Sequence, residues 1–182
     1  NIRLGEQPIT QLESDRFGVV AVLGGLLRRA AFENFLTGQA IVYFMRDDAL
    51  VACEKYVDRT RSDIPREQLA ALLEGPGEME RRQGMERIVP LGVGEDDILG
   101  IQVVEGTMLV NLSENFRAAI HTAGPEQETL LCYSIVNTLC ENNGVRRVCF
   151  FFEGEQVEKI AGVIYWSGVF YQNDGLVEPS FG

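Results

Sequence analysis

The strongest structural signal in this chain of 182 residues is the segment GPEQETLLCYSIVNTLCENNG at 124–144. Glycine and proline at its start interrupt the preceding segment, and Glu126 and Glu128 favour a helix N-terminus, where the helix dipole attracts negative charge. Apolar side chains then recur at helical spacing, at Leu131, Cys132, Ile135, Val136, Leu139 and Cys140. The run Asn-Asn-Gly at 142–144 ends the pattern, because glycine readily closes a helix. The stretch therefore predicts a long helix with one buried face.

Three predicted β-hairpins flank this helix in the sequence. Their strands are rich in β-branched and aromatic residues and are joined by short acidic turns: 40–45 with 50–57, 98–104 with 107–112, and 145–152 with 157–160. Glu105-Gly106 turns the second hairpin, since glycine supplies the positive φ angle that a two-residue turn needs. Alternation within this hairpin directs three side chains to one face: Met108, Val110 and Leu112.

Two shorter helices are also predicted. One begins at Asp63 and ends at Gly75-Pro76, because proline cannot continue a helix. Ser113 caps the other, at 114–120, with a hydroxyl that can accept a hydrogen bond from the first turn. The charged segment between them is expected to contact the core through Ile88, Val89 and Leu91. Hairpins separated by single helices predict an α+β fold, with a single mixed or antiparallel sheet and helices packed on one face.

Residues 1–38 form an N-terminal segment ahead of a predicted domain at 39–178 and a tail at 179–182. Its apolar side chains recur near helical spacing and predict an amphipathic helix: Val20, Leu23, Leu27, Ala30 and Ala31. The alternative is a short hairpin turned at Gly24-Gly25. Either structure has an apolar face that must pack on the domain or on a partner. Because the chain starts at Asn1 without a methionine or a basic leader, we expect a targeting segment to have been removed.

Net charge limits the partners of the chain. The formal net charge is −11 at pH 7, and residues 1–87 hold 12 basic and 14 acidic side chains, whereas residues 88–182 hold 4 and 13. This surplus repels a phosphate backbone or an anionic membrane surface, so we expect no nucleic acid as partner. The longest apolar stretch, 17–27, is far shorter than the roughly 20 residues that span a bilayer. If the domain self-associates, we expect the N-terminal segment or a basic partner at the interface, because two acidic halves repel each other.

Few residues are candidates for chemistry. The chain has four cysteines without the spacing of a zinc site, all typical of small core residues: Cys53, Cys132, Cys140 and Cys149. The only histidine, His121, ends a short predicted helix, where a cation suits the dipole. Carboxylates at 47–48 and 95–97 lack the spacing of a calcium loop and are typical of turns. We therefore expect no catalytic residue, no cofactor and no metal site. The rival hypothesis is a hydrolase that pairs Cys53 or a carboxylate with His121.

Aromatic residues near the C-terminus are the best candidates for a recognition surface: Tyr165, Trp166, Phe170 and Tyr171. Aromatic rings dominate the energetics of interfaces, which favours this interpretation. The alternative is that the rings close one edge of the core. Taken by themselves, the residues describe an α+β domain that is not an enzyme.

The order of several short motifs resembles the GerMN domain family over about residues 39–178. In chain order the motifs are AIVYF at 40–44, LLEGP at 72–76, VPLG at 89–92, GTMLVNLS at 106–113, SIVNTL at 134–139, and Gly144-Val145 with Val148 and Glu153-Gly154. Each motif is short and hydrophobic, so their order and spacing carry the resemblance. GerMN domains occur in spore germination and sporulation lipoproteins and in some envelope lipoproteins.

The resemblance implies an exported bacterial protein that is a membrane-anchored lipoprotein in its full-length form, with a lipid anchor outside this chain as its only contact with the membrane. It implies a non-enzymatic role in assembly at the cell envelope, in sporulation or germination, by self-association or by binding a protein partner. An alternative function is an extracytoplasmic sensor of a small ligand or cell-wall fragment, held near the aromatic cluster. The third is the hydrolase described above.

Overall fold

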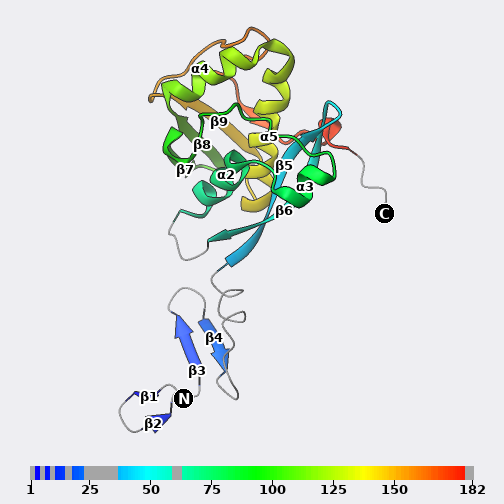
Figure 1. Cartoon of the computed structure of the whole chain (residues 1–182). Helices are drawn as coiled ribbons and strands as arrows, with labels where there is room; N and C mark the ends of the chain where they lie inside the picture. The colour runs from blue at the N-terminus through cyan, green and yellow to red at the C-terminus, as the bar shows by residue number, and fades with distance from the viewer. Residues whose placement is uncertain are drawn as a thin grey trace.

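The computed structural model describes residues 3–4, 7–8, 11–14, 18–22, 37–58 and 63–178 (Figure 1). From residue 37 onward it has two sheets: a ribbon of β5 (Thr37–Arg46) and β6 (Ala49–Asp58), and a four-stranded sheet of β7 (Ile98–Val104), β8 (Thr107–Leu112), β9 (Arg147–Phe152) and β10 (Phe170–Tyr171). The helices are α2 (Ile64–Glu74), α3 (Glu78–Arg82), α4 (Glu114–Ala123) and α5 (Pro125–Asn143). Short 3₁₀ turns follow at Glu95–Asp97 and Asp174–Leu176. The α+β class is as predicted.

The predicted long helix is α5, and it runs through the middle of the described domain (Figure 1). It contacts the ribbon, β9, α2 and α4. The predicted apolar stripe from Leu131 to Cys140 is buried. Gly144, with a φ angle of 64°, closes the helix in the left-handed conformation, as the sequence predicts.

Two predicted hairpins and both shorter helices are confirmed. β5 pairs with β6, and β7 with β8, through the expected tight turns. The Asp63 side chain accepts a hydrogen bond from the Arg66 amide at the start of α2, and the Ser113 hydroxyl accepts one from the Phe116 amide at the start of α4. Among the described residues, none of the helices combines the length and hydrophobicity that crossing a bilayer requires.

The third predicted hairpin is wrong in its second half. Residues 157–160 form bends and irregular backbone, and β9 instead lies between β8 and β10, in the sheet order β10-β9-β8-β7. β8 and β9 are parallel, and the chain between them forms α4 and α5. A parallel neighbour reached through such a long crossover leaves no signal in the adjacent sequence, so the sequence favours the nearest apolar run.

The predicted single sheet is instead two sheets, because α5 occupies the edge of β5. The Tyr43 amide donates to Thr138 Oγ1 at 3.1 Å, and the Ser134 hydroxyl donates to the Tyr43 carbonyl at 2.7 Å. One turn further along the helix, Asn142 accepts from the Ile41 amide at 2.9 Å and donates to its carbonyl at 2.7 Å. Side chains of the helix therefore satisfy the backbone groups that another strand would otherwise pair with.

The charged segment before β7 contains the short helix α3, which the sequence did not predict. Ile88 and Val89 are buried as expected, whereas Leu91 is 87% exposed and its predicted core contact is wrong. The Arg87 guanidinium explains the difference, because it donates to the carbonyls of Val89 and Val93 at 2.8 and 2.9 Å. These bonds close the loop at its base and leave its tip in solvent.

The N-terminal segment contributes β1 (Arg3–Leu4), β2 (Gln7–Pro8), β3 (Gln11–Ser14) and β4 (Gly18–Val22), which pair antiparallel as β1 with β2 and β3 with β4. Val20 therefore lies in a strand, and the helix predicted to begin there is wrong at this point. Three valines in five residues explain this, since β-branched side chains favour extended backbone. The other predicted helix positions and the alternative turn at Gly24-Gly25 lie outside the described residues.

Candidate functional site

Within the part of the chain that the structure describes, one face of the four-stranded sheet carries no helix. Cross-strand partners share a face, and the face that holds Met108, Val110 and Leu112 is directed into the core. The opposite face, called here the open sheet face, consists of Gly100, Gln102, Val104, Thr107, Leu109, Asn111, Arg147, Cys149, Phe151 and Tyr171. A hollow of about 300 Å³ lies on it, with Leu99 at the margin of the sheet as a further lining residue.

The open sheet face is nearly uncharged, although it belongs to the acidic part of the chain. Arg147 is the only Asp, Glu, Lys or Arg in this set, and its guanidinium donates to the Glu105 carbonyl at 2.9 Å. Leu109 and Phe151 are half-buried, and Leu99 is 45% exposed. A surface that combines exposed apolar side chains with uncharged polar ones is typical of sites at which proteins dock.

The outer edge of β6 is a second candidate binding site, because part of its backbone has no neighbouring strand among the described residues. Near one end of the strand, the Leu50 carbonyl accepts a hydrogen bond from the Glu178 amide at 2.8 Å. Alternation along the strand directs the backbone groups of Ala52, Glu54 and Tyr56 to the same edge, and within the described chain no backbone group pairs with them there. The Glu54 carbonyl accepts a hydrogen bond from the Cys53 thiol at 3.6 Å. An exposed edge strand can pair with a strand of another chain.

The predicted aromatic cluster divides between core and surface. Trp166 is fully buried and lies edge-on to Phe150 with ring centroids 5.1 Å apart, and Phe170 is also buried. Tyr165 and Tyr171 are 57% and 58% exposed. The alternative role, closing the core, is therefore correct for Trp166 and Phe170. Neither of the two cavities described for this structure is lined by a member of the cluster.

A buried carboxylate holds Trp166, and the sequence did not single it out for this role. Glu128 is fully buried in the first turn of α5 and accepts a hydrogen bond from the Trp166 indole nitrogen at 2.8 Å. It also accepts bonds from the amides of Ala161, Val163 and Ile164, at 2.7 to 3.1 Å. Burial opposes the charge of Glu128, but the bond from Trp166 and the three amides outweigh it and lower its pKa.

The acidic turn at 95–97 holds the second buried carboxylate. Asp97 accepts hydrogen bonds from the Ser113 hydroxyl at 2.5 Å, the Gly94 amide at 2.9 Å and the Asn115 side chain at 3.1 Å. Burial opposes its charge, but these bonds prevail and lower its pKa. Asp97 thus joins the loop before β7 to the start of α4. Among the described residues, no three His, Cys, Asp or Glu side chains are grouped as metal ligands.

A sequence signal for Glu128 exists. It precedes Leu131 by three residues and Ile135 by seven, so it lies on the buried face of the helix and not only at its N-terminus. Ser134, Thr138 and Asn142 are likewise spaced four residues apart and form a polar stripe beside the apolar one. Neither pattern names the groups that these side chains bind.

Cys53 and His121 are not brought together. Cys53 lies on β6, where its sulfur is 3.7 Å from the Glu80 carboxylate, and burial together with Glu80 raises the pKa of its thiol. His121 lies in the last turn of α4, and Figure 1 places α4 and β6 far apart. The four thiols are free, and those of Cys132, Cys140 and Cys149 are buried as expected.

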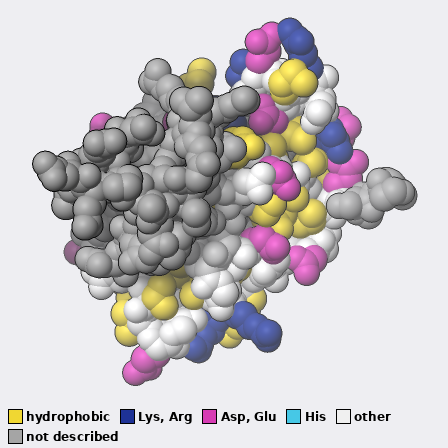
Figure 2. Space-filling view, turned by 90° about the horizontal axis from the view of Figure 1, so that it is seen from below, with side chains coloured by type: hydrophobic (Ala, Val, Ile, Leu, Met, Phe, Trp, Pro, Cys, Tyr) yellow, Lys and Arg dark blue, Asp and Glu magenta, His cyan; other side chains and the backbone are white. Residues whose placement is uncertain are grey.

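Charged side chains are dispersed on the face shown in Figure 2. On its described part, basic side chains stand in small separate groups among carboxylates and hydrophobic side chains. This distribution differs from the continuous basic surface that binds a phosphate backbone.

Comparison with known proteins adds a family and a fold. The sequence model of the Germane family, described as sporulation and spore germination, matches residues 41–158. The tandem GerMN domains of the sporulation protein GerM from Bacillus subtilis are similar in structure, with a TM-score of 0.59, 16% identity, and coverage of 97% of this chain and 58% of that one. The first GerMN domain of that protein has a TM-score of 0.53 and 15% identity, with coverage of 76% of this chain and 99% of that one. A candidate lipoprotein from Clostridium perfringens has a TM-score of 0.50 and 19% identity, with coverage of 78% of this chain and 93% of that one.

These findings confirm the resemblance to GerMN domains. At identities of 15 to 19%, the solved structures show the shared fold alone. The chain spans 58% of the tandem structure and nearly all of the two shorter ones. No curated protein matches it.

Proposed function

Because the chain belongs to the Germane family of sporulation and spore germination proteins, we propose that it is a non-enzymatic protein of the bacterial cell envelope that works by binding protein. Its partner is a further copy of itself or another envelope protein. The observation that carries this proposal is the open sheet face, which is hollowed and nearly uncharged and has the partly exposed apolar side chains Leu99, Leu109 and Phe151 at its hollow.

Electrostatics favour this face over the rest of the acidic half. Residues 88–182 hold 13 acidic and 4 basic side chains, so most surfaces in this half repel a second copy. Docking on the open sheet face covers Leu99, Leu109 and Phe151 without bringing carboxylates together. The sequence predicts an interface at the N-terminal segment or with a basic partner. The open sheet face is an alternative interface, and it lies within the acidic half.

The non-enzymatic part of the proposal rests on how the reactive groups are engaged. The raised pKa of the Cys53 thiol keeps it protonated and therefore weakly nucleophilic. The two buried carboxylates, Glu128 and Asp97, use their oxygens to hold loops in place. Steady turnover of an ester or peptide substrate that is lost in Cys53→Ser would contradict this part.

A matched pair of leucine variants tests the role of the open sheet face. Leu99→Asp adds a charge beside the hollow, and Leu91→Asp adds one on the exposed loop before β7. We expect the unaltered chain to sediment as an oligomer or to recover a partner from envelope extract. Leu99→Asp should abolish the association, and Leu91→Asp should retain it.

Two outcomes would count against this assignment. A strict monomer that recovers no partner contradicts the assembly function itself. Equal loss of association in Leu99→Asp and Leu91→Asp contradicts the choice of the open sheet face, because the two charges lie on different parts of the surface.

We also place the full-length protein outside the cytoplasm, held by a lipid anchor. The similarity in fold to a candidate lipoprotein supports this location. The test is growth of the native host with an alkyne-tagged fatty acid, followed by capture of the full-length protein. Incorporation of the label is the expected result, and an unlabelled protein in the cytoplasmic fraction refutes the anchor.

A further inference from the structure

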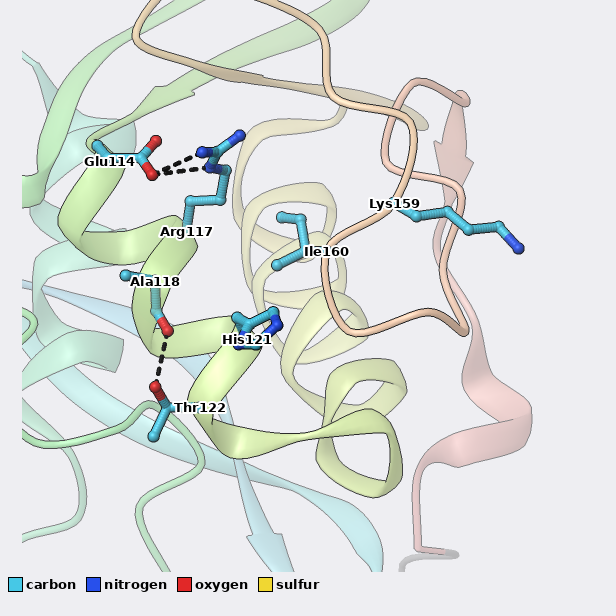
Figure 3. Close-up of a pocket in the computed structure, with 7 residues that line it drawn as sticks. All are labelled: Glu114, Arg117, Ala118, His121, Thr122, Lys159 and Ile160. Atoms are coloured by element: carbon cyan, nitrogen blue, oxygen red, sulfur yellow. Dashed lines mark hydrogen bonds and ion pairs between the residues drawn. The ribbon is translucent and has the colours of Figure 1, made fainter.

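A second cavity lies between α4 and the segment that follows β9. Its volume is about 460 Å³, and Arg117, Ala118, His121, Lys159 and Ile160 are among its lining residues. Figure 3 shows Arg117 and His121 one turn apart on the side of α4 that faces Ile160, whose side chain extends toward the helix. The volume lies within the range of small-molecule sites.

Positive charge is concentrated at this cavity in a part of the chain that is otherwise acidic. Residues 88–182 contain four Lys and Arg side chains and the only histidine, and Arg117, Lys159 and His121 of that set line the cavity. One carboxylate, Glu114, also lines it, so the basic groups outnumber the acidic one. The Lys159 amine extends away from the cavity and lies 4.2 Å from the centre of the Tyr165 ring. Arg117 and His121 are therefore the groups that face a ligand.

Arg117 and His121 each have hydrogen-bonding groups without a partner in the described structure. Arg117 donates from Nε and Nη2 to one oxygen of Glu114, at 3.0 and 2.7 Å, which fixes the guanidinium and leaves Nη1 without a partner in the described structure. Among the described residues, neither ring nitrogen of His121 has a hydrogen-bond partner. The Thr122 hydroxyl is not a free donor, since it bonds to the Ala118 carbonyl at 2.9 Å.

We propose that this cavity binds a small organic carboxylate. Its charged end accepts hydrogen bonds from Arg117 Nη1 and from the His121 imidazole, because a planar carboxylate offers two oxygens to two donors on one helix face. Its apolar end lies against Ile160 and Ala118. The site is separate from the open sheet face, so it adds a ligand to the proposed assembly function and does not depend on it.

Titration of the ¹⁵N-labelled full chain with isovalerate tests the proposal by NMR. We expect saturable shifts of the amides of α4 and of the His121 imidazole. Isovaleramide, which has the same apolar body without the charge, should produce none. Arg117→Gln should weaken isovalerate binding about tenfold, as the loss of a charge-assisted hydrogen bond predicts.

The control variant is Arg82→Gln. Arg82 is also an exposed helical arginine paired with a glutamate of its own helix, Glu78, but it lies on α3 and outside the cavity. It should bind isovalerate as the unaltered chain does. Saturable binding of isovaleramide, tighter binding of inorganic phosphate than of isovalerate, equal weakening by both variants, or the absence of saturable shifts would each overturn the proposal.

Discussion

The ribbon and the four-stranded sheet are attached to α5 by different kinds of contact. The ribbon is held by polar side chains, in which Ser134, Thr138 and Asn142 bond to the edge of β5. The sheet is held by rings, in which Trp166 packs on Phe150 and is fixed by one buried carboxylate. Apolar packing is common to both, since Phe44 of the ribbon and Phe150 of the sheet are fully buried. The buried hydrogen bonds therefore determine which partner lies at which position.

Removal of the Trp166 ring should give the largest loss of stability. Trp166→Ala empties a fully buried position in contact with Phe150 and leaves Glu128 without its indole donor. We expect the free energy of unfolding to fall by about 4 kcal/mol, measured by urea denaturation. Tyr165→Ala is the matched control and should cost less than about 1 kcal/mol, because Tyr165 is 57% exposed. Similar losses in both variants would refute the role of Trp166 in the core.

Neutralisation of the buried carboxylate should rank second. In Glu128→Gln, an amide group replaces one of the oxygens that accept four hydrogen bonds. The expected loss is about 3 kcal/mol, because donors to a charged group are left unpaired in the interior. Glu126→Gln is the control, since Glu126 lies exposed in the same helical turn and should cost less than about 0.5 kcal/mol.

The pH dependence of stability separates a charge effect from a packing effect in this variant. Folding lowers the pKa of Glu128 below its ordinary value of 4.5, so its contribution is fully present above that value and is lost as the pH falls through the folded pKa. Glu128→Gln should therefore lose less stability on acidification than the unaltered chain. Parallel stability curves for the two proteins below pH 4.5 would show that the ionised form is not the stabilising one.

Loss of one polar contact to the ribbon should have a smaller effect. Thr138→Val keeps the shape of the side chain but leaves the Tyr43 amide unpaired in a buried position. We expect a loss of about 2 kcal/mol and faster hydrogen exchange at Tyr43. Thr122→Val removes a hydroxyl from the exposed side of α4 and should change stability by less than about 0.5 kcal/mol. Unchanged exchange at Tyr43 would refute the role of α5 in covering this edge.

The surface variant Leu99→Asp should have the smallest effect on stability. Leu99 is 45% exposed, so the free energy of unfolding should change by no more than about 0.5 kcal/mol, even though association is lost. Thermal unfolding of the monomeric fraction measures this. A large loss would mean that the side chain supports the fold and would remove it as a probe of docking.

Local patterns in the sequence were enough to place most elements. The stripe from Leu131 to Cys140 gives α5, and the capping residues Asp63 and Ser113 give the starts of α2 and α4. Such patterns do not indicate the exposed Leu91 or the missing strand at 157–160. Side-chain bonds of Arg87 to two loop carbonyls decide the first, and a parallel crossover decides the second. The resemblance to the GerMN family was recognisable for the same reason as the elements, since it rests on short runs in a fixed order.

The helices, the two tight hairpins and the uneven charge can be predicted from the sequence. Helical and strand periodicity and capping act within a few residues, so they leave a local pattern. The order of the strands, the separation of the ribbon from the sheet and the partners of Glu128 follow from long-range packing. These features depend on contacts such as that of Tyr43 with Thr138, which are 95 residues apart. A polar side chain on a buried helix face must find a partner, but only the packing of the whole chain decides which group arrives there.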